Sequence, residues 1–312
     1  MPLSGTLHPD AKAILFVALA LFTLFYLGAL AVGARRAGAA QDQPRGPTLG
    51  GMATGFLVNF LDTLGIGSFA TSTTIFRQWR MVRDEQLPGT LNVGNTLPTI
   101  AEAFIYTTIV PVDVRTLIAM IAAAVLGAWL GAGVVSRWPR RRVQLGMGLA
   151  LVAAAALMVA AQLKLVPAGG DLLRLDDGRF LLGLVGNFAL GALMTIGIGL
   201  YAPCMILVSL LGMNPTAAFP IMMGSCAFLM PIASARFIRG RCFDLRASLG
   251  LLVGGVPGVL VAAFIVKSLP LTAVRWLVVV VVVYAAATLL RAARRERSAS
   301  LAVGAEADAM TP

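Results

Sequence analysis

The chain has 312 residues, of which 58% are hydrophobic and only 12% are charged, and its mean hydropathy is +0.86. This composition excludes an ordinary soluble domain, in which about a quarter of the residues carry a charge. The formal net charge of +11 does not indicate nucleic-acid binding, because the arginines lie in short loops between apolar stretches, as in the positive-inside pattern of membrane proteins.

Seven apolar stretches are long enough to cross a bilayer as helices. In chain order they cover residues 12–34, 90–110, 115–136, 143–163, 216–236, 247–266 and 272–290. The first is too long for the apolar core of a cleaved signal peptide, so we expect it to be retained. Two further stretches, 49–76 and 180–211, are longer and interrupted. The sequence therefore predicts an all-α polytopic membrane protein.

The two halves of the chain repeat each other. Four landmarks recur at a spacing of 130 to 132 residues, namely Gly65 and Gly197, Gly94 and Gly224, Asp113 and Asp244, and Gly127 and Gly258. Internal repeats are typical of secondary transporters, whose substrate site lies between the repeats.

The basic loops indicate that the two repeats are inverted. In the first half, arginines follow the interrupted stretch and return after residue 136; in the second half they gather at 236–246 and after residue 290. If basic loops are cytoplasmic, the repeats face opposite sides of the membrane. Inversion needs an odd number of crossings, so each interrupted stretch is expected to form a broken or re-entrant hairpin before three spans. The N-terminus would lie outside and the C-terminus in the cytoplasm.

These features divide the chain into five segments. They are an N-terminal transmembrane helix with a cytoplasmic loop (1–48), a first repeat (49–163), a connecting loop (164–179), a second repeat (180–291) and a disordered cytoplasmic tail (292–312).

Glycines mark the points where the interrupted stretches are expected to break. Irregular backbone at membrane depth is tolerated where it lines a cavity, and a helix that restarts there points partly positive amides into it. Two such helix starts would form an anion site without a buried lysine. The residues expected to line it are Thr63, Gly65, Gly67, Ser68, Thr71, Thr195, Gly197, Gly199, Tyr201 and Cys204. The alternative is that the glycines only let helices pack closely.

A second paired feature is a proline-containing span with polar residues. Residues 88–98 include Asn92, Asn95 and Thr96, and residues 215–231 include Ser225. In an apolar helix these side chains need partners. A substrate could supply them, and so could hydrogen bonds between helices. The sequence leaves both interpretations open.

Two carboxyl groups fall within the predicted membrane segments. Asp62 lies three residues before the first glycine break, and Glu102 lies in the next span. Ionisable residues at this depth are costly and are functional candidates by default. We expect Asp62 to take up and release a proton; Glu102 is the second candidate and could instead be structural. Their counterparts in the second half are Met194 and a residue near Ala233, so acidic residues within the predicted membrane segments are confined to the first half.

No metal site, disulfide framework or cofactor is expected. His8 is the only histidine, and the three cysteines, Cys204, Cys226 and Cys242, do not have the spacing of a ligand cluster.

Four segments carry a family resemblance. They read Asn-Phe-Leu-Asp-Thr-Leu-Gly-Ile-Gly (59–67), Pro-Gly-Thr-Leu-Asn-Val-Gly (88–94), Gly-Ile-Gly-Leu-Tyr-Ala-Pro-Cys (197–204) and Gly-Ser-Cys-Ala-Phe-Leu-Met-Pro (224–231). Through them the chain, from about residue 49 to 291, resembles the sulfite exporter TauE/SafE family of membrane permeases. The resemblance implies a bacterial inner-membrane carrier of sulfite, sulfonates or related small anions that works without ATP.

The sequence therefore predicts a secondary transporter whose partners are a small anionic substrate and the lipid bilayer, with no nucleic acid; the oligomeric state is left open. An anion channel that uses the same site is the alternative. A membrane enzyme is the third hypothesis, which is disfavoured because no nucleophile–base pair or phosphate-binding loop is apparent.

Overall fold

The computed structural model describes residues 9–38, 46–64, 67–165, 170–196, 199–214 and 217–265, together with 283, 286–287, 290–291 and 294. In this part of the chain the regular structure is helical, apart from one isolated bridge between Leu172 and Met213. The predicted fold class is confirmed.

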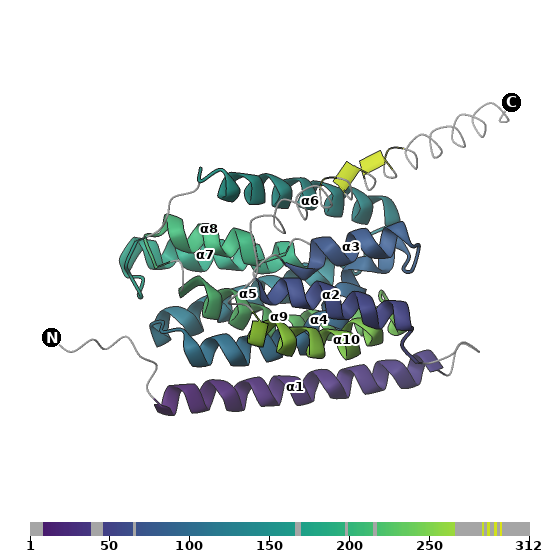
Figure 1. Cartoon of the computed structure of the whole chain (residues 1–312), viewed down its shortest axis with the longest axis horizontal. Helices are drawn as coiled ribbons and strands as arrows, with labels where there is room; N and C mark the ends of the chain where they lie inside the picture. Colours follow the sequence, from purple (N-terminus) through teal and green to yellow (C-terminus); the bar gives the residue numbers. More distant parts are fainter. Residues whose placement is uncertain are drawn as a thin grey trace, which may run out of the picture.

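The helices follow the predicted segments closely (Figure 1). The first half forms α1 (Pro9–Gly38), α2 (Leu49–Thr63), α3 (Ser68–Gln78), the short 3-10 helix η1 (Asp84–Gln86), α4 (Leu87–Ile109), α5 (Val114–Val135) and α6 (Arg140–Gln162). The second half forms α7 (Asp177–Met194), α8 (Tyr201–Leu210), α9 (Ala218–Arg239) and α10 (Leu245–Ile265). The predicted span 272–290 and the predicted tail lie almost entirely outside the described residues.

One pair of repeat landmarks has a clear structural cause. Asp113 precedes α5, and its Oδ1 accepts a hydrogen bond of 2.9 Å from the backbone N–H of Thr116. Asp244 precedes α10 and accepts one of 2.9 Å from the N–H of Ala247. An N-cap aspartate satisfies a backbone donor that the first helical turn leaves free. The same residue therefore starts the same helix in both halves.

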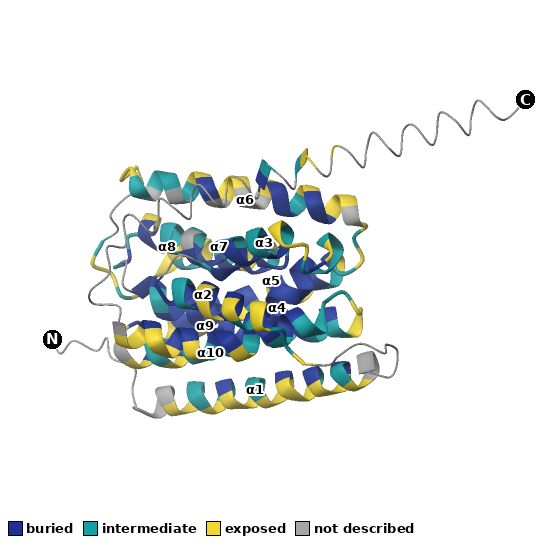
Figure 2. Ribbon diagram, turned by 45° about the vertical axis from the view of Figure 1, so that its right-hand side comes forward, coloured by how far each residue is buried: buried dark blue, intermediate teal, exposed yellow. Residues whose placement is uncertain are grey.

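Several helices suit a lipid environment. Four of those described, α1, α5, α9 and α10, are long and apolar enough to cross a membrane on their own. The apolar window of α9 is 83% buried, whereas that of α1 is only 22% buried. Figure 2 shows the same contrast: α9 lies in the interior, and a long stripe of exposed residues runs along α1. Since these exposed residues include Ile14, Leu21 and Leu24, the outer face of α1 is suited to lipid.

Helices from different halves of the chain pack closely against each other at two glycines. Gly258 of α10 lies against the backbone carbonyl of Phe56 in α2, and Gly127 of α5 lies against the carbonyl of Phe188 in α7. Each interrupted stretch therefore packs on a helix of the other half. Glycine allows this approach because it has no Cβ atom. The spacing of the Gly127 and Gly258 landmarks reflects these two equivalent contacts.

The two interrupted stretches occupy different ends of the bundle. In Figure 1, α2 and α3 lie toward the right and α7 and α8 toward the left. This placement fits hairpins that enter from opposite sides. The orientation of the repeats in a membrane stays a prediction.

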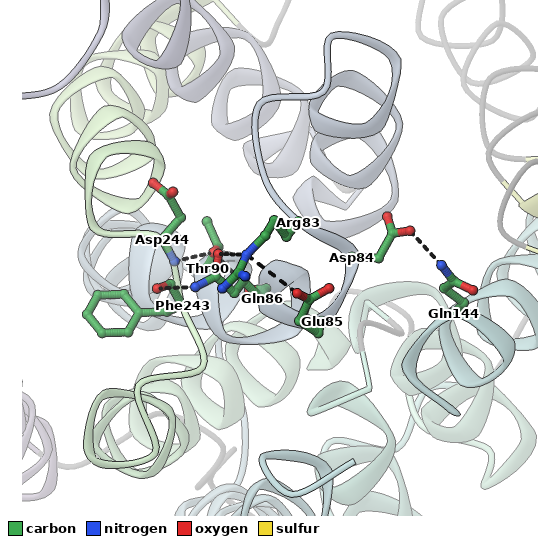
Figure 3. Close-up of polar contacts among 8 residues, drawn as sticks. All are labelled: Arg83, Asp84, Glu85, Gln86, Thr90, Gln144, Phe243 and Asp244. Carbon is green, nitrogen blue, oxygen red and sulfur yellow. Dashed lines mark hydrogen bonds and ion pairs between the residues drawn. The ribbon is translucent and has the colours of Figure 1, made fainter. Parts of the chain in front are cut away.

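A polar cluster joins the halves at the start of α4 (Figure 3). The Thr90 hydroxyl oxygen accepts a hydrogen bond of 2.9 Å from the backbone N–H of Asp244, and the Gln86 side chain donates one of 3.3 Å to the carbonyl of Phe243. Nearby, Gln144 of α6 donates to Asp84 at 2.8 Å. The first two contacts fix the loop between α9 and α10 against the start of α4, and the third holds α6 against η1.

The glycine contacts lead to a test. Gly127→Ala and Gly258→Ala should each lower stability by about 1–3 kcal/mol, because the new methyl group would overlap a backbone carbonyl. Gly28→Ala in α1 is the matched control, since nothing lies within 4 Å of a Cβ atom there. Thermal unfolding in detergent measures the difference; an unchanged midpoint in both core variants would contradict the packing described.

Candidate functional site

A small cavity lies where the two interrupted stretches meet. Its lining comes from both breaks and from the two central helices, and consists of Asp62, Gly67, Ser68 and Phe69, then Met194, Gly199, Leu200 and Tyr201, with Thr99 of α4 and Cys226 of α9. The space between these groups, counted with its open side, is about 220 Å³. In this conformation its interior has room for about one water molecule.

The start of α3 is held by the carboxyl group of Asp62. Its Oδ1 accepts a hydrogen bond of 2.7 Å from the backbone N–H of Ser68, and its Oδ2 accepts one of 2.8 Å from the Ser68 hydroxyl. Gly67, which precedes the helix, has a φ of +87°, a conformation that residues with a side chain rarely adopt. The helix start that was expected to face a substrate is thus occupied by an acidic side chain of the chain itself.

The start of α8 differs from that of α3. It begins at Tyr201 after Leu200, and no side chain among the described residues caps it. Pro203 lies in its first turn, where a missing N–H costs nothing. Gly199, just before the helix, has no atom within 4 Å of a Cβ position. The partly positive end of α8 therefore faces the cavity side of the break, with no side-chain acceptor bonded to it among the described residues.

A second carboxyl group, that of Glu102, lies fully buried in α4. Its Oε1 lies 2.8 Å from the Thr63 hydroxyl at the end of α2, and its Oε2 accepts a hydrogen bond of 2.5 Å from the Tyr201 hydroxyl. Tyr106, one turn along α4, donates a hydrogen bond of 2.8 Å to the backbone carbonyl of Thr63. Both breaks are therefore connected to α4.

The polar residues of the proline-containing spans form hydrogen bonds within the protein. Asn92 donates to the carbonyl of Pro88 at 2.8 Å, and Asn95 donates to that of Leu91 at 3.0 Å. The Thr96 hydroxyl lies 3.1 Å from that of Ser234. None of the three lines the cavity described above. These contacts favour the interpretation that the residues hold helices together.

Two buried asparagines that sequence analysis did not single out form equivalent bridges. Asn59 of α2 donates a hydrogen bond of 3.0 Å to the side-chain oxygen of Asn95, and Asn187 of α7 donates one of 2.9 Å to the hydroxyl of Ser225. Each bridge ties the first helix of a broken stretch to the central helix of its own half. The sequence signal that could have identified Asn59 and Asn187 is an amide side chain in an otherwise apolar helix.

The remaining predicted site residues differ in their surroundings. Thr71 and Thr195 donate to carbonyls of their own segments, at 2.9 Å to Ser68 and 2.7 Å to Ala192. Cys204 is buried in α8. Gly65 and Gly197 lie outside the described residues. The cavity adds Thr99, Met194 and Cys226 to the set.

The fold and the cavity together define a helical membrane protein with a small, mainly apolar cavity between two broken helices, the architecture of secondary transporters. The model of the sulfite exporter TauE/SafE family matches residues 3–158, half of the chain. The chain belongs to this family, which consists of membrane transporters of sulfur-containing anions. No curated protein and no solved structure matches it. The matched part contains both buried carboxyl groups.

The capping role of Asp62 can be tested by two substitutions. Asp62→Ala should lower stability by about 0.5–2 kcal/mol, because the N–H of Ser68 loses its acceptor. Asp62→Asn should stay close to the wild type, since asparagine caps helices about as well as aspartate. Thermal unfolding in detergent compares the three proteins. Equal stability of the alanine variant and the wild type would contradict this role.

Proposed function

We propose that the protein is a secondary carrier that moves a small anion across a bacterial inner membrane by alternating access, and that it is not an enzyme. The substrate would be sulfite, an organosulfonate or a related oxyanion. The observation that carries the proposal is the cavity, which is lined by the breaks of both halves. In transporters built from repeats, a site at this position opens to either side as the repeats move against each other.

The start of α8 beside the cavity supports an anionic substrate. It presents backbone N–H groups, whereas the hydroxyl protons of Ser68 and Tyr201, which also line the cavity, are already donated to Asp62 and Glu102. Backbone amides at a helix start are a common way to bind an oxyanion. Asp62 is the one acidic group in the lining, and it already accepts two hydrogen bonds from Ser68. A cation site would use several oxygen ligands of negative charge.

The orientation follows from the charge of the loops. Arginines gather between α3 and α4, between α5 and α6, and between α9 and α10. With these loops in the cytoplasm, the two halves are inverted, the N-terminus is outside and the C-terminus is inside.

Proton coupling is part of this proposal. Asp62 and Glu102 are both buried, at 3% and 0% exposure, and neither forms an ion pair among the described residues. Reversible protonation of such a group would let a proton gradient drive accumulation or export of the anion.

Counterflow tests the carrier directly. Proteoliposomes preloaded with unlabelled sulfite should transiently accumulate labelled sulfite from outside, because a carrier exchanges substrate across the membrane. Unlabelled sulfonates should compete if they share the site. An anion channel would equilibrate the label without an overshoot. No accumulation by folded protein would exclude sulfite exchange.

A cavity-filling variant locates the site. Gly199→Leu should reduce counterflow by about tenfold or more, since its side chain would enter the free space beside the start of α8. The backbone at Gly199 does not have a positive φ, so the fold should tolerate the change. Gly28→Leu on the exposed side of α1 is the control and should transport normally. Normal transport by folded Gly199→Leu would place the substrate elsewhere.

A further inference from the structure

Among the described residues, Glu102 is the one side chain that bonds to residues beside both breaks. Thr63, its partner at Oε1, is the last residue of α2, and Tyr201, its partner at Oε2, is the first residue of α8. The two partners belong to different halves of the chain. A change in the protonation of this carboxyl group would therefore alter hydrogen bonds at both breaks.

The hydrogen bonds around Thr63 allow its protons to be counted. The Thr63 hydroxyl lies 2.9 Å from the backbone carbonyl of Asn59 and 2.8 Å from Glu102 Oε1. A hydroxyl has one proton, and a carbonyl can only accept. With an ionised Glu102, the one proton of Thr63 would be shared between two acceptors. Both contacts are separate two-centre hydrogen bonds only if Glu102 is protonated and donates to Thr63. The resulting chain runs from the Tyr201 hydroxyl through Glu102 and Thr63 to the carbonyl of Asn59.

The surroundings of Glu102 agree with a neutral carboxyl group. The titratable groups that face it are Asp62 from α2, Tyr106 of α4, Tyr201 from α8 and Cys226 from α9. None of them is a cation, and Glu102 forms no ion pair among the described residues. A buried charge without a counter-charge is costly. A proton on Glu102 removes that cost.

Asp62 has a different set of partners. Both of its oxygens accept hydrogen bonds, from a backbone N–H and a hydroxyl of Ser68, at the partly positive end of α3. This arrangement suits an ionised carboxylate with a structural role. Two nearby acids in unlike surroundings commonly take different roles.

We propose that Glu102, and not Asp62, is the residue that carries the coupled proton during transport; this inference rests on the proposed carrier function. When the proton leaves, the Glu102 carboxylate can only accept hydrogen bonds. The single proton of the Thr63 hydroxyl can then be donated either to Glu102 or to the carbonyl of Asn59. The continuous chain between the breaks is then lost, so protonation and the relative position of the two halves depend on each other. Ala233 occupies the equivalent position in α9. Glu102 therefore has no counterpart in the second half, and one carboxyl group carries the proton in each transport cycle.

Glu102→Gln is the decisive variant. Its amide can donate to Thr63 and accept from Tyr201, as protonated Glu102 does, but it cannot release a proton. We expect Glu102→Gln to retain sulfite counterflow within about threefold of the wild type, at equal pH on both sides. The wild type should accumulate or expel sulfite up to about tenfold under a pH difference of one unit with the membrane potential clamped. Glu102→Gln should show no such gradient-driven transport.

Asp62→Asn is the comparison variant, and protein-free liposomes correct for unmediated sulfite movement. Asp62→Asn should keep the response to the pH gradient, whatever its rate. The inference is overturned if folded Glu102→Gln keeps that response, if it loses counterflow as well, or if only Asp62→Asn loses the response. Absence of counterflow in the wild type would instead exclude sulfite exchange, and with it the carrier function proposed for sulfite.

A second pair of variants covers the case in which Glu102→Gln does not fold. Tyr201→Phe removes the hydroxyl bonded to Glu102 and should move the pH midpoint of transport by about half a unit or more. Tyr106→Phe removes a hydroxyl bonded to the Thr63 carbonyl and should leave the midpoint in place. Equal pH profiles for Tyr201→Phe and the wild type would overturn the proposal.

Discussion

The structure depends on the need to satisfy backbone groups where two membrane helices break. Inside a bilayer no water is available for a free N–H or carbonyl, so the protein must provide the partners. At the first break, Asp62 accepts from the N–H of Ser68, and Tyr106 donates to the carbonyl of Thr63. Of these two groups, Asp62 also lines the cavity. A site of this kind is therefore a consequence of the broken fold.

The duplicated halves share a framework, but their chemistry differs. Asp113 and Asp244 start equivalent helices, and Gly127 and Gly258 make equivalent contacts. At the breaks the symmetry ends: α3 is capped by Asp62, whereas α8 starts without a side-chain cap. Substrate binding at the start of α8 and proton binding at Glu102 can then be assigned to different halves of the chain.

Sequence analysis predicted the fold well because hydrophobic length and glycine position are local signals. The ends of the helices lie within a few residues of the predicted spans, and both interrupted stretches break near their Gly-x-Gly segments. Side-chain partners were harder to predict. Neither the pairing of Glu102 with Tyr201, 99 residues away, nor that of Asn187 with Ser225 follows from periodicity, because each depends on how helices from distant segments pack. For Asn92 and Asn95 the sequence left substrate binding and helix packing open, and both side chains bond to helix carbonyls.

The central claim is that the cavity between the breaks is reached from both sides of the membrane in turn. Side-specific labelling of Gly199→Cys with an impermeant thiol reagent tests it most directly, in a background where Cys204, Cys226 and Cys242 are replaced by serine. The account predicts that this position reacts from either face of oriented proteoliposomes and that sulfite slows both reactions. Labelling from one face only, or labelling that sulfite does not affect, would contradict an alternating-access site at this position.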